Sequence, residues 1–229
     1  MLNLYDYIKD FFFPKICIIT NNKLKPDNSN EFIEDTAFAN LDKIKPEELI
    51  EMRTKVKSDY FNSYLSFKKD NSVQAIIHYL KYNGFFNLGA FLGSYFGSEY
   101  IKTFPRVRQY DILCPVPLFK TKLRERGYNQ SEYICNGINS VLNISQINDL
   151  VIRIRHTKSQ TNLKYFERLS NVKDAFQLNP EYKNNISGKN VLLVDDVMTT
   201  GATINEVIKV LRNEDVKEIS ALTIASAGK

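Results

Sequence analysis

The chain has 229 residues, 43% hydrophobic and 25% charged. At about 150 residues per domain, this length predicts one domain with an appendage or two small domains. With 9 glycines, 7 prolines and 3 cysteines, the composition excludes a collagen-like chain and a disulfide-rich secreted protein. The net charge of +5 is too small to indicate a nucleic-acid partner by itself.

The first 58 residues differ from the rest of the sequence. They contain an aromatic start that charged residues interrupt, an asparagine-rich stretch over residues 21–30, and a helical pattern after Pro46. The start has no basic leader and does not resemble a secretory signal. We therefore divide the chain into an N-terminal helical or irregular appendage, residues 1–58, and a larger domain, residues 59–229.

The next segments alternate between strand and helix patterns. Residues 59–68 favour a strand, and residues 71–81 favour a helix that Asn71 caps. The apolar positions of this helix follow the spacing of one buried face: Val73, Ile76, Ile77 and Leu80. A second apolar helix is expected over residues 84–102. The nearly uncharged run over residues 82–98, which overlaps this helix, is shorter than the ~20 residues that a membrane span needs. We therefore expect no membrane insertion and a cytoplasmic protein.

The second half continues the alternation. Residues 111–114 predict a short buried strand, and Asn129 with Glu132 predicts a capping box for the next helix. Residues 150–154 are the next candidate strand, followed by a polar basic stretch over residues 155–174. The segment VLLVDD predicts a strand, ATINEVIKVLRN a helix and EISALTIAS a last strand. Strands that alternate with helices indicate an α/β fold with a mostly parallel central sheet flanked by helices.

Arginine is concentrated in the middle of the chain. Seven of the nine arginines lie between residues 106 and 168. The planar guanidinium matches phosphate and carboxylate groups, so this concentration points to an anionic ligand, although a solvated surface is the better explanation for any single one of these arginines.

The string VLLVDDVMTTGAT, residues 191–203, carries the strongest chemical signal. Ligands of open α/β sheets bind beyond the carboxyl ends of the strands, where Asp195 and Asp196 stand. The loop from Thr199 to Thr203 opens a helix whose free N–H groups suit a phosphate. Two carboxylates would repel that phosphate, so they must face a sugar diol or a hydrated Mg²⁺. The competing interpretation is that the aspartates cap a helix and that Gly-Ala forms a tight turn. It explains either half of the string alone, but not the whole string.

This string resembles the phosphoribosyl pyrophosphate (PRPP) signature of type I phosphoribosyltransferases. The segments IIHYLKYNG (76–84), DILCPVPLFKTKLRERGYNQSE (111–132) and RIRHTKSQTNLKYFERLSNVKDAF (153–176) narrow the resemblance to the ComF family of competence-associated proteins. The four segments stand in the family's order, and the resemblance covers roughly residues 60–226. The resemblance implies a type I phosphoribosyltransferase-like fold.

The resemblance also implies roles for individual residues. Asp195 and Asp196 would bind the ribose hydroxyls directly or through Mg²⁺. The 5-phosphate loop would consist of Thr199, Thr200, Gly201, Ala202 and Thr203. The pyrophosphate would meet Pro115, Val116 and Pro117, with Lys81 as a further candidate and with Arg124 and Arg126 as catalytic cations. A mobile loop that closes over PRPP would include Arg155, Thr157, Gln160 and Arg168.

The implied reaction is displacement of pyrophosphate from ribose C1 by a nitrogen nucleophile, with PRPP and Mg²⁺ as ligands. Nothing in the sequence identifies the acceptor. The alternative is a non-catalytic protein of DNA uptake that binds single-stranded DNA or competence proteins on the same fold. ComF proteins commonly begin with a zinc module of two CxxC pairs, but here Thr20 follows Cys17 where a second cysteine would stand. A structural zinc site needs four ligands, so we expect no zinc.

Overall fold

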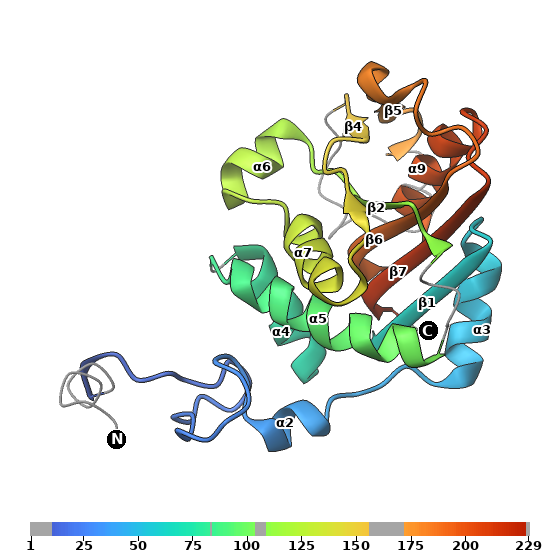
Figure 1. The fold of residues 1–229 in the computed structure, drawn as a ribbon. Coiled ribbons are helices and arrows are strands. Elements are labelled where there is room, and N and C mark those ends of the chain that lie inside the picture. Colours follow the sequence, from blue (N-terminus) through green and yellow to red (C-terminus); the bar gives the residue numbers. More distant parts are fainter. Residues whose placement is uncertain (1–10, 83, 104–108, 156–171, 228–229) are drawn as a thin grey trace.

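A computed structural model of the chain describes residues 11–82, 84–103, 109–155 and 172–227 (Figure 1). Its centre is a parallel sheet with the strand order β1-β7-β6-β2-β3. These strands are β1 (Tyr60–Ser66), β2 (Ile112–Pro115), β3 (Ser145–Gln146), β6 (Asn190–Met198) and β7 (Glu218–Ser226). The α/β class and the parallel sheet that the sequence predicts are therefore confirmed.

Helices cover both faces of this sheet (Figure 1). On one face lie α4 (Ser72–Tyr82), α5 (Phe86–Thr103) and α7 (Gln130–Leu142), and on the other lie α3 (Pro46–Lys55) and α9 (Ala202–Arg212). Further helical elements among the described residues are α2 (Asp35–Ala39), α6 (Lys120–Arg126) and the short 3-10 helix η3 (Pro180–Tyr182). No helix in these ranges is long and apolar enough to cross a membrane.

Strand β6 lies between two hydrophobic cores and contributes side chains to both. Leu192 and Val194 are buried in the core formed with α4, α5 and α7, whereas Val191 and Leu193 are buried in the core formed with α3 and α9. This division follows from the alternation of side chains along a strand, and it explains why β6 is apolar at four consecutive positions.

The predicted elements before residue 103 are confirmed within two residues of their expected ends. The stripe predicted for α4 is buried at all four positions, and the Asn71 side chain accepts a hydrogen bond from the Gln74 N–H at 3.0 Å. At α7 the cap is simpler than predicted. Asn129 accepts from the Ser131 N–H at 3.2 Å and contacts Glu132 through its side chain, so the full capping box is not formed.

The strand predicted over residues 150–154 forms, but outside the main sheet. β4 (Val151–Arg153) pairs antiparallel with β5 (Phe176–Leu178) in a separate two-stranded sheet. The alternation of strands and helices is thus interrupted here, and β3 takes the edge position beside β2. The short helix α6, between β2 and α7, also adds an element that the capping pattern did not indicate.

The N-terminal segment contacts both faces of the larger body. In its first part, Phe32 packs against Phe85, just before α5, and Phe38 packs against Phe91 of α5, with ring centroids 6.3 and 5.3 Å apart. Met52 and Val56, in and after α3, are buried with β6 and α9. The division of the chain at residue 58 remains a prediction, but these contacts join the segment to both cores.

Helices α5 and α7 approach each other through two glycines. A Cβ at Gly93 would lie 2.1 Å from the Ile134 carbonyl oxygen, and one at Gly137 would lie 2.0 Å from the Ala90 carbonyl oxygen. Real Cβ atoms do not come this close to backbone, so a side chain at either position would push the helices apart. The helix that carries Ser131 therefore has its position set by backbone contact.

We predict that Gly93→Ala lowers the free energy of unfolding by about 3 kcal/mol, because overpacking against backbone outweighs the gain of about 1 kcal/mol from better helix propensity. Gly97→Ala is the matched control on the same helix, since its Cβ would lie 3.3 Å from the Ile138 Cα. Urea denaturation of both variants measures the difference. Equal stabilities for the two variants would contradict the prediction.

Candidate functional site

The candidate site lies at the carboxyl end of β6, next to the end of β2. Pro115 pairs with Val194, and the Val116 N–H donates to the Val194 carbonyl at 2.8 Å. The segment Pro115–Pro117 therefore lies directly beside Asp195. The structure brings together the acidic pair and the proline segment, which are far apart in the sequence.

Asp196 is a buried carboxylate with a cationic partner. Its exposed fraction is 3%, and its Oδ2 lies 2.9 Å from the Lys81 Nζ at the end of α4. Its Oδ1 accepts a hydrogen bond from the Val197 N–H at 2.7 Å. A buried carboxylate needs such compensation, because loss of one partner leaves an isolated charge in the protein interior.

Asp195 is held by different groups. Its Oδ1 accepts hydrogen bonds from the Ser131 hydroxyl at 3.1 Å and from the Asp196 N–H at 2.9 Å. Burial, followed by the negative charge of Asp196, raises the pKa of Asp195 to about 7. Burial lowers the pKa of Arg153 on β4, while the charge of Asp195 acts in the opposite direction. The negative charge of Asp195 therefore acts on the guanidinium of Arg153, which β4 carries.

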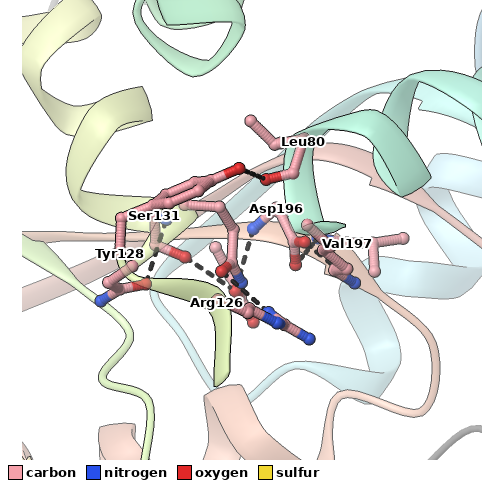
Figure 2. A network of polar contacts seen from close by, with 10 residues as sticks. Leu80, Arg126, Tyr128, Ser131, Asp196 and Val197 are labelled. Atoms are coloured by element: carbon pink, nitrogen blue, oxygen red, sulfur yellow. Dashed lines mark hydrogen bonds and ion pairs between the residues drawn. The ribbon is translucent and has the colours of Figure 1, made fainter. Parts of the chain in front are cut away.

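Arg126 lies near this pair at the end of α6. Its Nη1 donates to the Gln130 side chain at 2.9 Å, and its guanidinium lies over the Tyr82 ring at 5.3 Å from the centroid. In Figure 2, Arg126, Ser131 and Asp196 lie together, with Tyr128 donating to the Leu80 carbonyl next to them at 2.6 Å. Arg124, on the same helix α6, is exposed.

The predicted phosphate loop opens α9 as expected. A pocket is lined by Asp195, Val197, Met198 and all of residues 199–204. Gly201 caps the helix with a φ of 75°, in the left-handed region that favours glycine, and the Thr200 hydroxyl accepts from the Ala202 N–H at 3.3 Å. The first turn of a helix, with its N–H groups and the positive end of the helix dipole, suits an anion.

The end of α3 packs against the same loop. The Asn205 side chain donates to the Lys55 carbonyl at 2.8 Å and accepts from the Lys57 N–H at 2.8 Å. A Cβ at Gly201 would lie 3.4 Å from the Lys55 carbonyl oxygen. The N-terminal segment therefore supports the loop through backbone contacts.

The predicted mobile loop is described only at its first residue. Arg155 donates to the Lys173 carbonyl. Thr157, Gln160 and Arg168 lie outside the described residues. Their assignment to a loop over PRPP stays a prediction.

Carboxylate oxygens are the donors available for a metal at this site. Mg²⁺ prefers oxygen ligands and keeps several waters, so the two aspartates suit it, and Asp196 already holds one cationic group, the Lys81 ammonium. Within the described ranges, no cluster of three or more His, Cys, Asp or Glu side chains forms. Elsewhere, Cys17 accepts hydrogen bonds from the Thr20 and Glu34 N–H groups through its Sγ. The expected absence of zinc stays a prediction.

Three residues of the site were missed by the sequence patterns. Ser131 was hidden because its role depends on the position of α7. Arg153 was counted only as part of the arginine-rich stretch, and Asn205 appeared as one polar residue on a helix. The YNQSE segment, which is part of the family resemblance and contains Ser131, is the one signal that could have drawn attention to it.

Comparison with known proteins finds a matching family and several relatives for part of the chain. A family described as a phosphoribosyl transferase domain matches residues 142–229. The chain is 39% identical over 117 residues to Competence protein F of Haemophilus influenzae, covering 51% of each protein. It is 34% identical over 101 residues to DNA utilization protein YhgH of Escherichia coli, covering 44% of this chain and 43% of the relative. The chain thus spans about half the length of the curated relatives it matches.

Solved structures with low sequence identity are also similar. Adenine phosphoribosyltransferase from Saccharomyces cerevisiae is 13% identical with a TM-score of 0.36, covering 80% of this chain and 89% of that protein. An allosteric regulatory enzyme of purine biosynthesis is 17% identical with a TM-score of 0.39, covering 59% of this chain and 26% of that protein.

The parallel sheet, the matched domain and the loop after β6 define a type I phosphoribosyltransferase-like domain. Competence protein ComFC of Bacillus subtilis is a further relative, 32% identical over 113 residues that cover 48% of this chain and 42% of that protein. The resemblance to the ComF family of competence-associated proteins is thus confirmed over about half of the chain.

The raised pKa of Asp195 predicts a pH-dependent effect of its removal. In the folded protein Asp195 binds its proton more tightly than in the unfolded chain, so stability falls as pH rises from about 4 to about 7. Asp195→Asn removes this ionisation and can still accept from Ser131. We expect its Tm to exceed that of the wild type at pH 8 by on the order of 5 °C, with a smaller difference at pH 5.

Asp174→Asn is the control for this experiment. Asp174 is ion-paired with Lys209 at 3.0 Å, which lowers its pKa, so it stays ionised from pH 5 to pH 8. Its effect on Tm should not change over that range. A pH-independent effect of Asp195→Asn would contradict the prediction. Thermal unfolding followed by circular dichroism measures all three proteins.

Proposed function

We propose that this protein binds the magnesium complex of PRPP and transfers the phosphoribosyl group to a nitrogen nucleophile, releasing pyrophosphate. The observation that carries this proposal is the placement of two adjacent carboxylates, Asp195 and Asp196, in the last part of β6, just before the loop that opens α9. A ribose 5-phosphate has its phosphate and its two ring hydroxyls at opposite sides of the sugar. A helix N-terminus beside a carboxylate pair offers partners for both.

Each part of the ligand has matching groups in this arrangement. The 5-phosphate would bind the N–H and hydroxyl groups of residues 199–203. The ribose hydroxyls would donate hydrogen bonds to Asp195 and Asp196. The pyrophosphate would lie against Pro115–Pro117, with Arg126, which lies beside Ser131 and Asp196 in Figure 2, as a candidate cation. Bound Mg²⁺, held by the aspartates, would neutralise charge on the departing pyrophosphate.

The protein's contribution to this reaction is positioning and charge. The nitrogen lone pair forms the new bond to C1 while the bond from C1 to the pyrophosphate oxygen breaks, and the leaving group takes both electrons. Cationic side chains that face the leaving oxygen stabilise this step without covalent chemistry. Cys114 and Cys135 are both buried, and burial raises the pKa of each thiol, so neither is suited to act as a nucleophile.

Calorimetric titration tests the ligand assignment. We expect PRPP with Mg²⁺ to bind the wild type and to lose at least about tenfold in affinity in Asp195→Asn/Asp196→Asn, because both hydroxyl and metal acceptors lose their charge. Asp27→Asn/Asp215→Asn is the matched control, since both residues are exposed and Asn tolerates the positive φ of Asp215. Undiminished binding by the first variant would overturn the site assignment. Separate titrations with ribose 5-phosphate and with pyrophosphate measure the affinity of the sugar-phosphate half and of the pyrophosphate half of the site.

The names of the relatives support a second candidate, binding of single-stranded DNA. One relative is a competence protein and another a DNA utilization protein. DNA that contacts several cationic side chains loses affinity steeply as salt is added, because counterions are released on binding. If this candidate is correct, affinity for a fluorescent oligonucleotide should fall at least about tenfold between 50 and 200 mM salt. Absence of binding at low salt would exclude it.

A further inference from the structure

The pair of Lys81 and Asp196 is the best-defined charge contact of the candidate site. The two side chains are 2.9 Å apart, and they expose 19% and 4% of their surfaces. Other ion pairs within the described ranges are more exposed, such as that of Lys102 with Glu99, where the exposed fractions are 71% and 41%. Exposed pairs of this kind contribute little to stability, whereas a buried pair has strict geometric requirements.

The fold delivers the Lys81 ammonium to this position. Lys81 lies in the last turn of α4, where the helix dipole favours a cation. The preceding carbonyl, of Leu80, accepts a hydrogen bond from the Tyr128 hydroxyl at 2.6 Å, which ties the end of α4 to the segment before α7. The buried face of α4 fixes the rotation of the helix, so Lys81 points toward the end of β6.

Asp196 has one oxygen for this cation and one for the backbone. Oδ1 accepts from the Val197 N–H, and Oδ2 contacts the Lys81 ammonium. A divalent cation that binds Asp196 through Oδ2 would meet a positive charge already in place. Two cations that share one buried carboxylate oxygen repel each other strongly, since the interior screens charge far less than water does.

We propose that Lys81 is an internal cation that competes with the divalent ion for Asp196. This inference rests on the proposed function, in which Asp196 helps to hold Mg²⁺. Lys81 keeps the buried carboxylate compensated in the absence of ligand and makes the free protein a poor binder of the bare ion. The metal then binds well only together with an anionic ligand, whose charge compensates the displaced ammonium. Free Mg²⁺ would therefore not occupy the site unproductively.

Binding of Mn²⁺ alone, with no nucleotide or sugar phosphate, tests the competition. Free Mn²⁺ is measured by electron paramagnetic resonance during titration of the wild type and of Lys81→Met, which retains the length of the side chain without its charge. We expect Lys81→Met to bind Mn²⁺ about tenfold more tightly than the wild type. Lys81→Arg retains the charge and should bind no more tightly than the wild type. Lys102→Met removes a lysine from the last turn of α5 and should change nothing.

A stability measurement covers the case in which Lys81→Met folds poorly. Removal of the ammonium leaves Asp196 as a buried unpaired charge, so this variant should have a lower Tm. Mn²⁺ should then raise its Tm more than it raises that of the wild type, because the ion replaces the lost cation. Lys81→Met/Asp196→Asn removes both charges and should recover stability without any gain in Mn²⁺ binding.

The outcomes separate this inference from the proposed function. If Lys81→Met shows neither tighter Mn²⁺ binding nor a larger Tm increase with Mn²⁺ than the wild type, the competition is overturned. If the wild type binds PRPP with Mg²⁺ in that case, the proposed function stands alone. If the wild type binds no PRPP while Lys81→Met gains Mn²⁺ affinity, the competition holds at a cation site and the proposed ligand is wrong.

Discussion

Two adjacent buried carboxylates near the end of a buried strand impose the main constraint on this structure, because each needs compensating partners. Asp196 meets Lys81 from α4 and accepts from the Val197 N–H. Asp195 accepts from the Ser131 hydroxyl of α7 and from the Asp196 N–H, and its charge also acts on Arg153 of β4. The layer of α4 and α7 thus reaches both carboxylates, and β4 carries a second cation.

The elements around the acidic pair are held in place by contacts that serve this arrangement. The glycine contacts between α5 and α7 set the position of the helix whose first turn contains Ser131, and the Ser131 hydroxyl reaches Asp195. On the other face, Asn205 joins the first turn of α9 to the end of α3. The site is therefore supported from the N-terminal segment as well as from the larger body. The raised pKa of Asp195 indicates that the protein tolerates an unfavourable charge there, as is common where a site must bind a ligand.

The internal cation gives this site a particular electrostatic character. A carboxylate pair with no nearby cation would attract any divalent ion, whereas one that is partly neutralised discriminates in favour of a metal that arrives with an anion. Lys81 lies on α4, outside the loop and strand that form the rest of the site, so its role can be changed without altering the phosphate loop. The ion pair also keeps Asp196 compensated when no ligand is bound.

Local patterns in the sequence determined much of the fold. The apolar period of residues 73–80, the four-residue apolar run of β6 and the small-residue loop before α9 each have a local physical cause, and the structure places them as expected. The same run places Asp195 and Asp196 near the end of the strand, although β6 continues past them to Met198. The family resemblance rests on these segments as well, because they include most of the candidate site.

Only the tertiary structure decided which groups meet. Local periodicity predicts a strand over residues 150–154, but pairing is a long-range property, and β4 joins β5 instead of the main sheet. The same limit applies to the site. Two pairs become neighbours only when helices from distant parts of the chain pack on the sheet: Lys81 with Asp196, and Ser131 with Asp195. The sequence by itself determined that the two aspartates follow a buried apolar run, and packing decided which distant side chains meet them, because no local interaction joins those side chains to the strand.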